Sequence, residues 1–192
     1  MFGFLKPRDP LLEPATKLYG SVVAQARQPF LYARLSVPDT MEGRFELIIL
    51  HLAMIIDRIR SESGSDDPFA KTLTGVFVTD IDDSYREIGI SDTKVPAKVK
   101  KAAAVLYDRT LQYRSLDEAG DLAGLRNALG ENIWRSDPDA QTEMETASGP
   151  NLAHMGRLAA YVRAARKHLA EQTIEQLETG RVTFPDPEFV AA

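Results

Sequence analysis

The chain of 192 residues contains no cysteine. Disulfide bonds, thiolate metal ligands and cysteine nucleophiles are therefore excluded. Histidine is scarce, with only His51, His154 and His168. A zinc site usually needs three or four ligands close together, and His154 and His168 are about four helical turns apart. We therefore expect no metal site.

Long apolar runs are also missing. The longest nearly uninterrupted one is LIILHLAMII, residues 47–56, and it has a histidine inside it. A membrane-spanning helix needs about 20 apolar residues, so this run predicts a buried core helix. The first residues, MFGFLKPRDP, lack the long apolar stretch of a signal peptide. We expect no transmembrane segment and a cytoplasmic protein, with a peripheral place on the inner membrane as an option.

The usual catalytic motifs are absent as well. The chain has no GxxxxGK[ST], GxGxxG, GxSxG or HExxH pattern, so neither a phosphate-binding loop nor a common hydrolase site is indicated. We expect no catalytic residues and no cofactor, as in a protein that binds. The acidic string DIDDS, residues 80–84, leaves one enzyme alternative open, in isoprenoid or haem metabolism. Its spacing differs from the paired magnesium-binding motifs of prenyl-transfer enzymes.

What the chain does have is an ordinary globular composition, 44% hydrophobic and 27% charged, with a net charge of −5. The charge is unevenly distributed. Residues 93–114 carry six basic and one acidic side chains, whereas residues 61–92 and residues 115–150 each carry two basic and eight acidic ones. One basic helix is thus expected between two acidic segments. The overall acidity argues against DNA as a partner.

The basic helix allows two interpretations. Its lysines are Lys94, Lys98, Lys100 and Lys101. They can form an ordinary solvated helix face, or a docking patch for an acidic partner, ribosomal RNA or anionic lipid head groups. A helical ligand-binding regulator is the alternative to a docking protein at this chain length.

Helical periodicity dominates and predicts an all-α fold, a compact bundle of about six helices with an extended C-terminal tail. We expect one domain over residues 1–192, with residues 1–9 and 180–192 loosely ordered. The clearest helix follows Asp39 and Thr40, either of which can cap it. The other predicted helices cover residues 10–27, 68–88, about 93–113, 116–134 and 151–178, with a packed connector over residues 29–40 and a loop over residues 135–150.

The helix after Thr40 carries two parallel patterns. A single apolar stripe is formed by Met41, Phe45, Ile48, Leu52, Ile55 and Ile59. Beside it, Arg44, His51 and Arg58 recur every seven residues, which places them on one polar stripe. Asp80 and Glu87 flank the next helix in the same way. These side chains can form ion pairs that fix the helix register, or a polar rim around a groove for a partner.

Two stretches resemble the ubiquinol–cytochrome c chaperone family. Residues 31–59 carry an aromatic residue, VPDT, GRFE and LH before an apolar helix, and residues 76–113 carry an acidic helix, RE-x-G, an aspartate and VP-x-K-x-K. Tyr85 and Asp108 depart from the family pattern. The family positions matched by this chain are Asp39, Thr40, Gly43, Arg44, Phe45, His51, Arg86, Glu87, Gly89, Asp92 and Lys98.

The resemblance implies an all-helical assembly factor for the respiratory ubiquinol–cytochrome c reductase, without an enzymatic role. It implies binding to the newly made cytochrome b subunit or to a partner protein, through the second to fourth predicted helices, and contact with the ribosome or membrane surface as options. The partner-binding residues expected on this basis and from the charge pattern are Arg44, His51, Arg58, Arg86, Glu87, Lys94, Lys98, Lys100 and Lys101.

Overall fold

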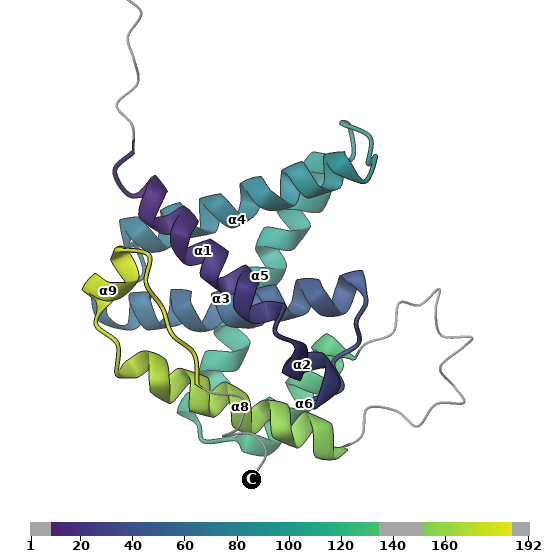
Figure 1. The fold of residues 1–192 in the computed structure, drawn as a ribbon, viewed down its shortest axis with the longest axis vertical. Coiled ribbons are helices and arrows are strands. Elements are labelled where there is room, and N and C mark those ends of the chain that lie inside the picture. The colour runs from purple at the N-terminus through teal and green to yellow at the C-terminus, as the bar shows by residue number, and fades with distance from the viewer. Residues whose placement is uncertain (1–8, 135–151, 186–192) are drawn as a thin grey trace, which may run out of the picture.

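The computed structural model describes residues 9–134 and 152–185, and all regular structure within these ranges is helical (Figure 1). The predicted all-α class is confirmed. The helices are α1 Leu12–Ala26, α2 Pro29–Ala33, α3 Met41–Ser63, α4 Pro68–Glu87, α5 Val95–Glu118, α6 Leu122–Ile133, α8 Leu152–Ala170 and α9 Ile174–Glu178.

The start of α3 is fixed by its cap. The Thr40 hydroxyl accepts the backbone N–H of Gly43 at 3.0 Å, which satisfies one of the free amides of the first turn. The chain folds back so tightly that a Cβ on Gly43 would lie 2.1 Å from the carbonyl oxygen of Pro38. Only glycine fits there. This turn sets Asp39 beside Arg44, one turn into the helix.

Helix α3 is the centre of the molecule, with α1, α4, α5, α6, α8 and α9 all packed around it (Figure 1). Between residues 47 and 57 every side chain except that of Ile48 is buried. The buried surface of α3 is therefore wider than the single apolar stripe expected from the sequence. The expected stripe is also too long, because Met41 at its start is 63% exposed. A helix surrounded on all sides buries every face.

Helices α4 and α5 form an antiparallel pair whose connecting end, residues 88–94, projects away from the other helices (upper right in Figure 1). Helix α4 begins at the predicted position, where the Asp67 carboxylate accepts the N–H of Ala70 at 2.8 Å. It ends before Gly89, which takes the positive φ of 82° that favours glycine after a helix. The predicted stop is confirmed.

Two predicted helix boundaries differ from the structure, and the structure has one short helix that the sequence did not predict. Residues 116–118 continue α5, and the break falls at Gly120, so that α6 starts at Leu122 with Asp121 as its cap. The long last helix is interrupted after Ala170, because Thr173 and Gln176 form a reciprocal capping box that begins α9. The connector before Thr40 contains the short helix α2. The loop predicted for residues 135–150 lies outside the described residues.

The stretch after α9 is extended, as predicted, but it is anchored rather than loose. The Gln172 side chain bonds both the N–H and the carbonyl oxygen of Thr183 at 2.9 Å. Phe184 then packs the edge of its ring on His51, with 5.2 Å between ring centroids. Residues 1–8 and 186–192, also predicted to be loose, lie outside the described residues.

None of the described helices is long and apolar enough to cross a membrane.

Candidate functional site

The projecting end of the α4–α5 pair carries the four predicted lysines, and all four are exposed. Lys94, Lys98 and Lys101 are spaced by four and three residues, so they share one face of α5. The lysines that form ion pairs with described carboxylates are Lys17 and Lys71, elsewhere in the molecule. The positive charge of the α5 lysines is therefore left facing solvent, as the docking interpretation requires.

Exposed apolar side chains lie on the same helix. Lys100, Ala104, Tyr107 and Leu111 follow one another at helical spacing along one side of α5, with Tyr107 57% and Leu111 40% exposed. Ile88, at the end of α4, is 54% exposed. Helix α5 thus presents lysines and an uncovered apolar stripe together, a combination that suits association with another polypeptide.

Arg86 and Glu87, also predicted partner-binding residues, occupy the last turn of α4. Arg86 Nε lies 2.6 Å from Asp82 Oδ2, and the same guanidinium pairs with Asp92 in the connection to α5. The hydrogen bond between Arg86 and Asp82 raises the pKa of Arg86 above its usual value. Arg86 therefore braces the projecting end. Glu87 is exposed beside it.

Two acids of the string DIDDS, residues 80–84, which was considered as a magnesium motif, bond side chains of the fold itself. The hydroxyl of Tyr19 donates to Asp80 Oδ2 at 2.7 Å, and Asp82 holds Arg86. Within residues 9–134 and 152–185, no group of three or more histidine and acidic side chains is placed to hold a metal ion. Asp80 and Asp82 thus pair with side chains on α1 and α4, and Asp83 is exposed.

The seven-residue series on α3 is not one continuous rim. Arg44 is exposed at the first turn, His51 is fully buried in the middle, and Arg58 is mostly buried near the end. The sequence spacing correctly places the three on one side of α3. It could not show that α8 covers the middle and the end of that side. A partner-binding role for His51 or Arg58 stays a prediction.

His51 belongs to a hydrogen-bonded chain that joins α3, α8 and α1. Its Nδ1 lies 2.7 Å from the carbonyl oxygen of Leu47, and its Nε2 lies 2.7 Å from the hydroxyl of Tyr161, which also accepts from Gln25 at 2.9 Å. Burial lowers the pKa of His51 to about 4, so the ring is neutral at pH 7. A carbonyl can only accept, so Nδ1 carries the hydrogen and Tyr161 donates to Nε2.

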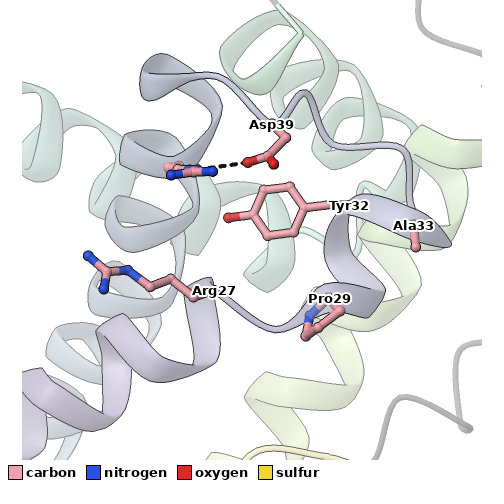
Figure 2. Close-up of a pocket in the computed structure, with 6 residues that line it drawn as sticks. Arg27, Pro29, Tyr32, Ala33 and Asp39 are labelled. Atoms are coloured by element: carbon pink, nitrogen blue, oxygen red, sulfur yellow. Dashed lines mark hydrogen bonds and ion pairs between the residues drawn. The ribbon is translucent and has the colours of Figure 1, made fainter.

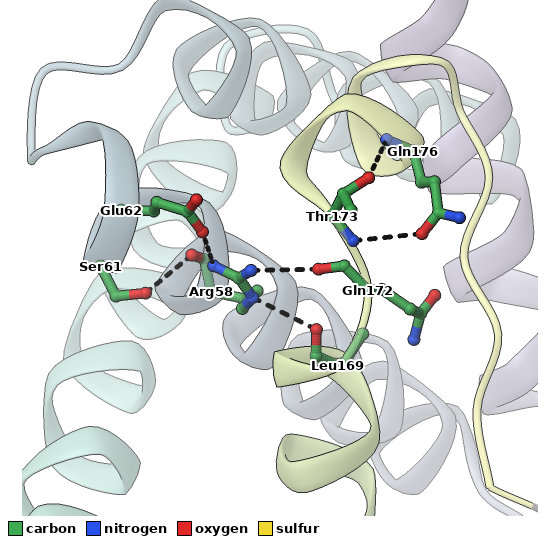
Figure 3. Close-up of polar contacts among 7 residues, drawn as sticks. All are labelled: Arg58, Ser61, Glu62, Leu169, Gln172, Thr173 and Gln176. Carbon is green, nitrogen blue, oxygen red and sulfur yellow. Dashed lines mark hydrogen bonds and ion pairs between the residues drawn. The ribbon is translucent and has the colours of Figure 1, made fainter.

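Arg58 closes the C-terminal end of α8 (Figure 3). Its Nε donates to the carbonyl oxygen of Leu169 at 3.2 Å and its Nη2 to that of Gln172 at 3.0 Å, while Nη1 pairs with Glu62. The last carbonyls of a helix have no partners within it, so these bonds satisfy otherwise free acceptors. Arg58 thus joins α3 to α8 and to the turn before α9.

Sequence reasoning missed a buried group of charges between α3, α5 and α8. Asp57 is 5% exposed and pairs with Arg166 of α8 and with Arg114 of α5, whose Nε lies 3.3 Å from Asp57 Oδ1. Arg166 Nε also lies 2.7 Å from Asp117 Oδ2. The available signal was an aspartate that directly follows the longest apolar run. Such a charge must be paired if the run is buried.

A pocket of about 690 Å³ was also missed. It lies between the end of α1, the short α2 and the first turn of α3 (Figure 2). Arg44 Nε lies 2.7 Å from Asp39 Oδ1, and the Tyr32 hydroxyl donates to the carbonyl oxygen of Ala26 at 2.8 Å. The pocket is lined by Arg27, Pro29, Tyr32, Ala33, Asp39 and Arg44.

Comparisons with known proteins agree with this architecture. Residues 33–184 match the family described as ubiquinol-cytochrome C chaperone. The chain belongs to the ubiquinol–cytochrome c chaperone family. The matched range includes the central helix α3, the lysine-bearing end of the α4–α5 pair and half of the residues that line the pocket. Arg27, Pro29 and Tyr32 precede it.

A solved structure supports the same assignment. The crystal structure of the Cbp3 homolog from Brucella abortus is 32% identical to this member of the chaperone family, with a TM-score of 0.73, covering 93% of this chain and 92% of that one. No curated protein matches the chain. The predicted resemblance is confirmed, and with it an assembly-factor role connected with ubiquinol–cytochrome c reductase. The family name describes a chaperone, in agreement with the expectation of a non-enzyme.

Proposed function

We propose that this member of the chaperone family binds the newly made cytochrome b subunit, or a protein that accompanies it, during assembly of ubiquinol–cytochrome c reductase. The binding surface would be the projecting end of α4 and α5 and, further along these helices, the start of α3, where Glu46 pairs with Arg109 of α5. Family membership supports the assembly role. The observation that favours this surface is the set of exposed lysines, without ion pairs to described carboxylates, on the helix that also exposes Tyr107 and Leu111 and close to the exposed Ile88.

Each part of the surface has a physical task in this proposal. Lys94, Lys98, Lys100 and Lys101 attract an acidic partner over a distance of about a Debye length and speed its approach. Tyr107 and Leu111 then lose their contact with water when an apolar segment covers them. Arg86 keeps the end of the pair in place. His51 and Arg58 join α3 to α8. The protein would act in the cytoplasm, near the inner membrane.

The assembly role is tested by deleting the gene and recording the spectrum of the membrane cytochromes. We expect reduced b- and c-type absorbance and reduced quinol oxidation through the cytochrome bc complex. Restoration of both by a plasmid copy is the control. Normal absorbance and normal activity in the deletion strain would reject the proposed function.

The binding surface is tested with charge reversal. We expect the double change Lys98→Glu and Lys101→Glu to abolish co-purification with tagged cytochrome b while the thermal midpoint stays that of the wild type. The matched control reverses two exposed cations of α8, Arg157→Glu and Lys167→Glu, and should leave co-purification intact. Unchanged co-purification in the α5 variant would mean that these lysines form only a solvated face.

A further inference from the structure

The pocket between α1, α2 and α3 brings two guanidinium groups to one opening. Arg27 lies at the end of α1 and forms no ion pair within 4.0 Å with any described carboxylate, whereas Arg44 uses its Nε for Asp39. In Figure 2 the ring of Tyr32 lies between Arg27 and Asp39. Each guanidinium has five N–H donors in a planar fork, and most of the donors at this opening form no hydrogen bond with a described residue.

The charge of the pocket is set by three side chains. The hydrogen bond from Arg44 lowers the pKa of Asp39, and the same contact raises the pKa of Arg44, so both stay charged at neutral pH. Partial burial raises the pKa of Tyr32, which stays neutral and presents its ring. Two cations and one anion leave a net charge of +1 facing the opening. One added negative charge neutralises it.

The size and the walls of the pocket restrict the ligand further. Its volume of about 690 Å³ far exceeds that of a small ion, since a water molecule takes about 30 Å³. Pro29, Ala33 and the ring of Tyr32 form apolar walls beside the two arginines. A phosphate group brings a charge of nearly −2 at pH 7 and would face the Asp39 carboxylate. A carboxylate on an apolar stem meets both conditions.

We infer that this pocket binds an aspartate or glutamate side chain presented by a polypeptide partner, with Arg27 and Arg44 donating to the carboxylate and Tyr32, Pro29 and Ala33 contacting its stem and neighbours. The inference rests on the proposed function in one respect, because it names the chemistry of a segment that a client or partner would present. The pocket is distinct from the α5 lysines.

The test uses the full chain and follows the arginine side-chain Nε–H signals by NMR. The probe is a capped seven-residue peptide with one glutamate at its centre among alanines and leucines. We expect this peptide to shift the signals of Arg27 and Arg44 in a saturable way. The same peptide with glutamine in place of glutamate, and inorganic phosphate at equal concentration, should bind at least about tenfold more weakly.

Matched variants assign the effect to the pocket. Arg27→Gln should weaken binding of the glutamate peptide about tenfold, whereas Arg34→Gln, an exposed arginine one residue beyond Ala33, should leave it unchanged. Arg27 makes no ion pair within the described fold, so this change spares the protein's stability. Equal shifts with the glutamine peptide, or with Arg27→Gln protein, would overturn the inference. Tighter binding of phosphate than of the peptide would overturn it too.

The outcomes separate this inference from the proposed function. If the glutamate peptide does not bind while the gene deletion removes the cytochrome bc complex, only the pocket assignment falls. If the peptide binds as expected while the deletion strain has normal cytochromes, the proposed function falls and the pocket remains a carboxylate site.

Discussion

The two ends of α5 use their charges in opposite ways. At its start, Lys94, Lys98 and Lys101 face solvent without ion pairs to described residues. Near its end, Arg114 pairs with the buried Asp57 of α3, and Asp117 pairs with Arg166 of α8. One end of the helix therefore contributes charge to the cohesion of the fold. The other end leaves its charge available for another molecule.

The difference follows from burial and from residue type. Removing a charge from water is costly unless a partner and hydrogen bonds replace the water, so Asp57 needs the arginines around it. Arginine suits this place because its fork can serve two carboxylates at once, as Arg166 serves Asp57 and Asp117. Lysines at an exposed end keep their hydration and stay mobile, which costs the fold little.

The largest effect is expected at the buried end. Asp57→Ala removes the carboxylate that Arg114 and Arg166 share, and Asp117 remains as the partner of the mostly buried Arg166. The free energy of unfolding should fall by about 3 kcal/mol. Urea denaturation at pH 7 measures it. Asp108→Ala, at an exposed position on α5, is the control and should change the stability by less than about 0.5 kcal/mol. Equal small losses in both variants would show that the Asp57 group does not hold the helices together.

A second test measures how the stability contributed by the buried His51 depends on pH. Burial lowers the pKa of His51 to about 4, while the unfolded chain has the ordinary value of 6.5. Between these values the unfolded state takes up a proton that the folded state excludes. Stability is therefore lost as the pH falls from about 6.5 to 4, by an amount on the order of 3 kcal/mol, and this contribution is constant above 6.5.

The variant His51→Gln isolates that contribution, because acidic side chains also titrate in the lower part of this range. Its stability should depend less on pH between 6.5 and 4 than that of the wild type. Ala104→Gln, at an exposed position of α5 without a titratable side chain, should keep the wild-type pH dependence. Parallel curves for the wild type and His51→Gln would contradict a neutral, buried His51.

A third and smaller effect is expected from the hydroxyl that joins α8 to His51. Tyr161→Phe keeps the ring in the core but leaves His51 Nε2 without its donor and Gln25 without its acceptor, which should cost about 1–3 kcal/mol. Thermal or urea unfolding measures the loss. Tyr107→Phe, at an exposed tyrosine of α5, should be nearly neutral. A neutral Tyr161→Phe variant would mean that water replaces the lost bonds.

These contrasts also mark what the sequence could predict. Local signals were sufficient for the start of α4 at Pro68 and its stop before Gly89, and they limited the cap of α3 to Asp39 or Thr40, because each of these features depends on neighbouring residues. The cluster of lysines at the start of α5 could be predicted from the distribution of charge along the sequence. The partners of Asp57, His51 and Arg58 on α8 could not be predicted, since they lie more than a hundred residues further along the chain, on a helix that packs against α3. The pocket likewise needs α1 and α2 placed beside the first turn of α3.

The smallest effect is expected at the exposed end of α5. Lys98 Nζ lies 5.5 Å from the centroid of the Tyr85 ring, a contact worth about 0.5–1 kcal/mol at an exposed site. Lys98→Gln should therefore lower the stability by no more than that, and Lys94→Gln should leave it unchanged. Urea denaturation of the two variants beside the wild type measures both. A loss above about 2 kcal/mol from Lys98→Gln would place this lysine with Arg114 among the charges that hold the fold. The reversed-charge variant could then lose its partner simply by unfolding, so this measurement must come before the co-purification experiment.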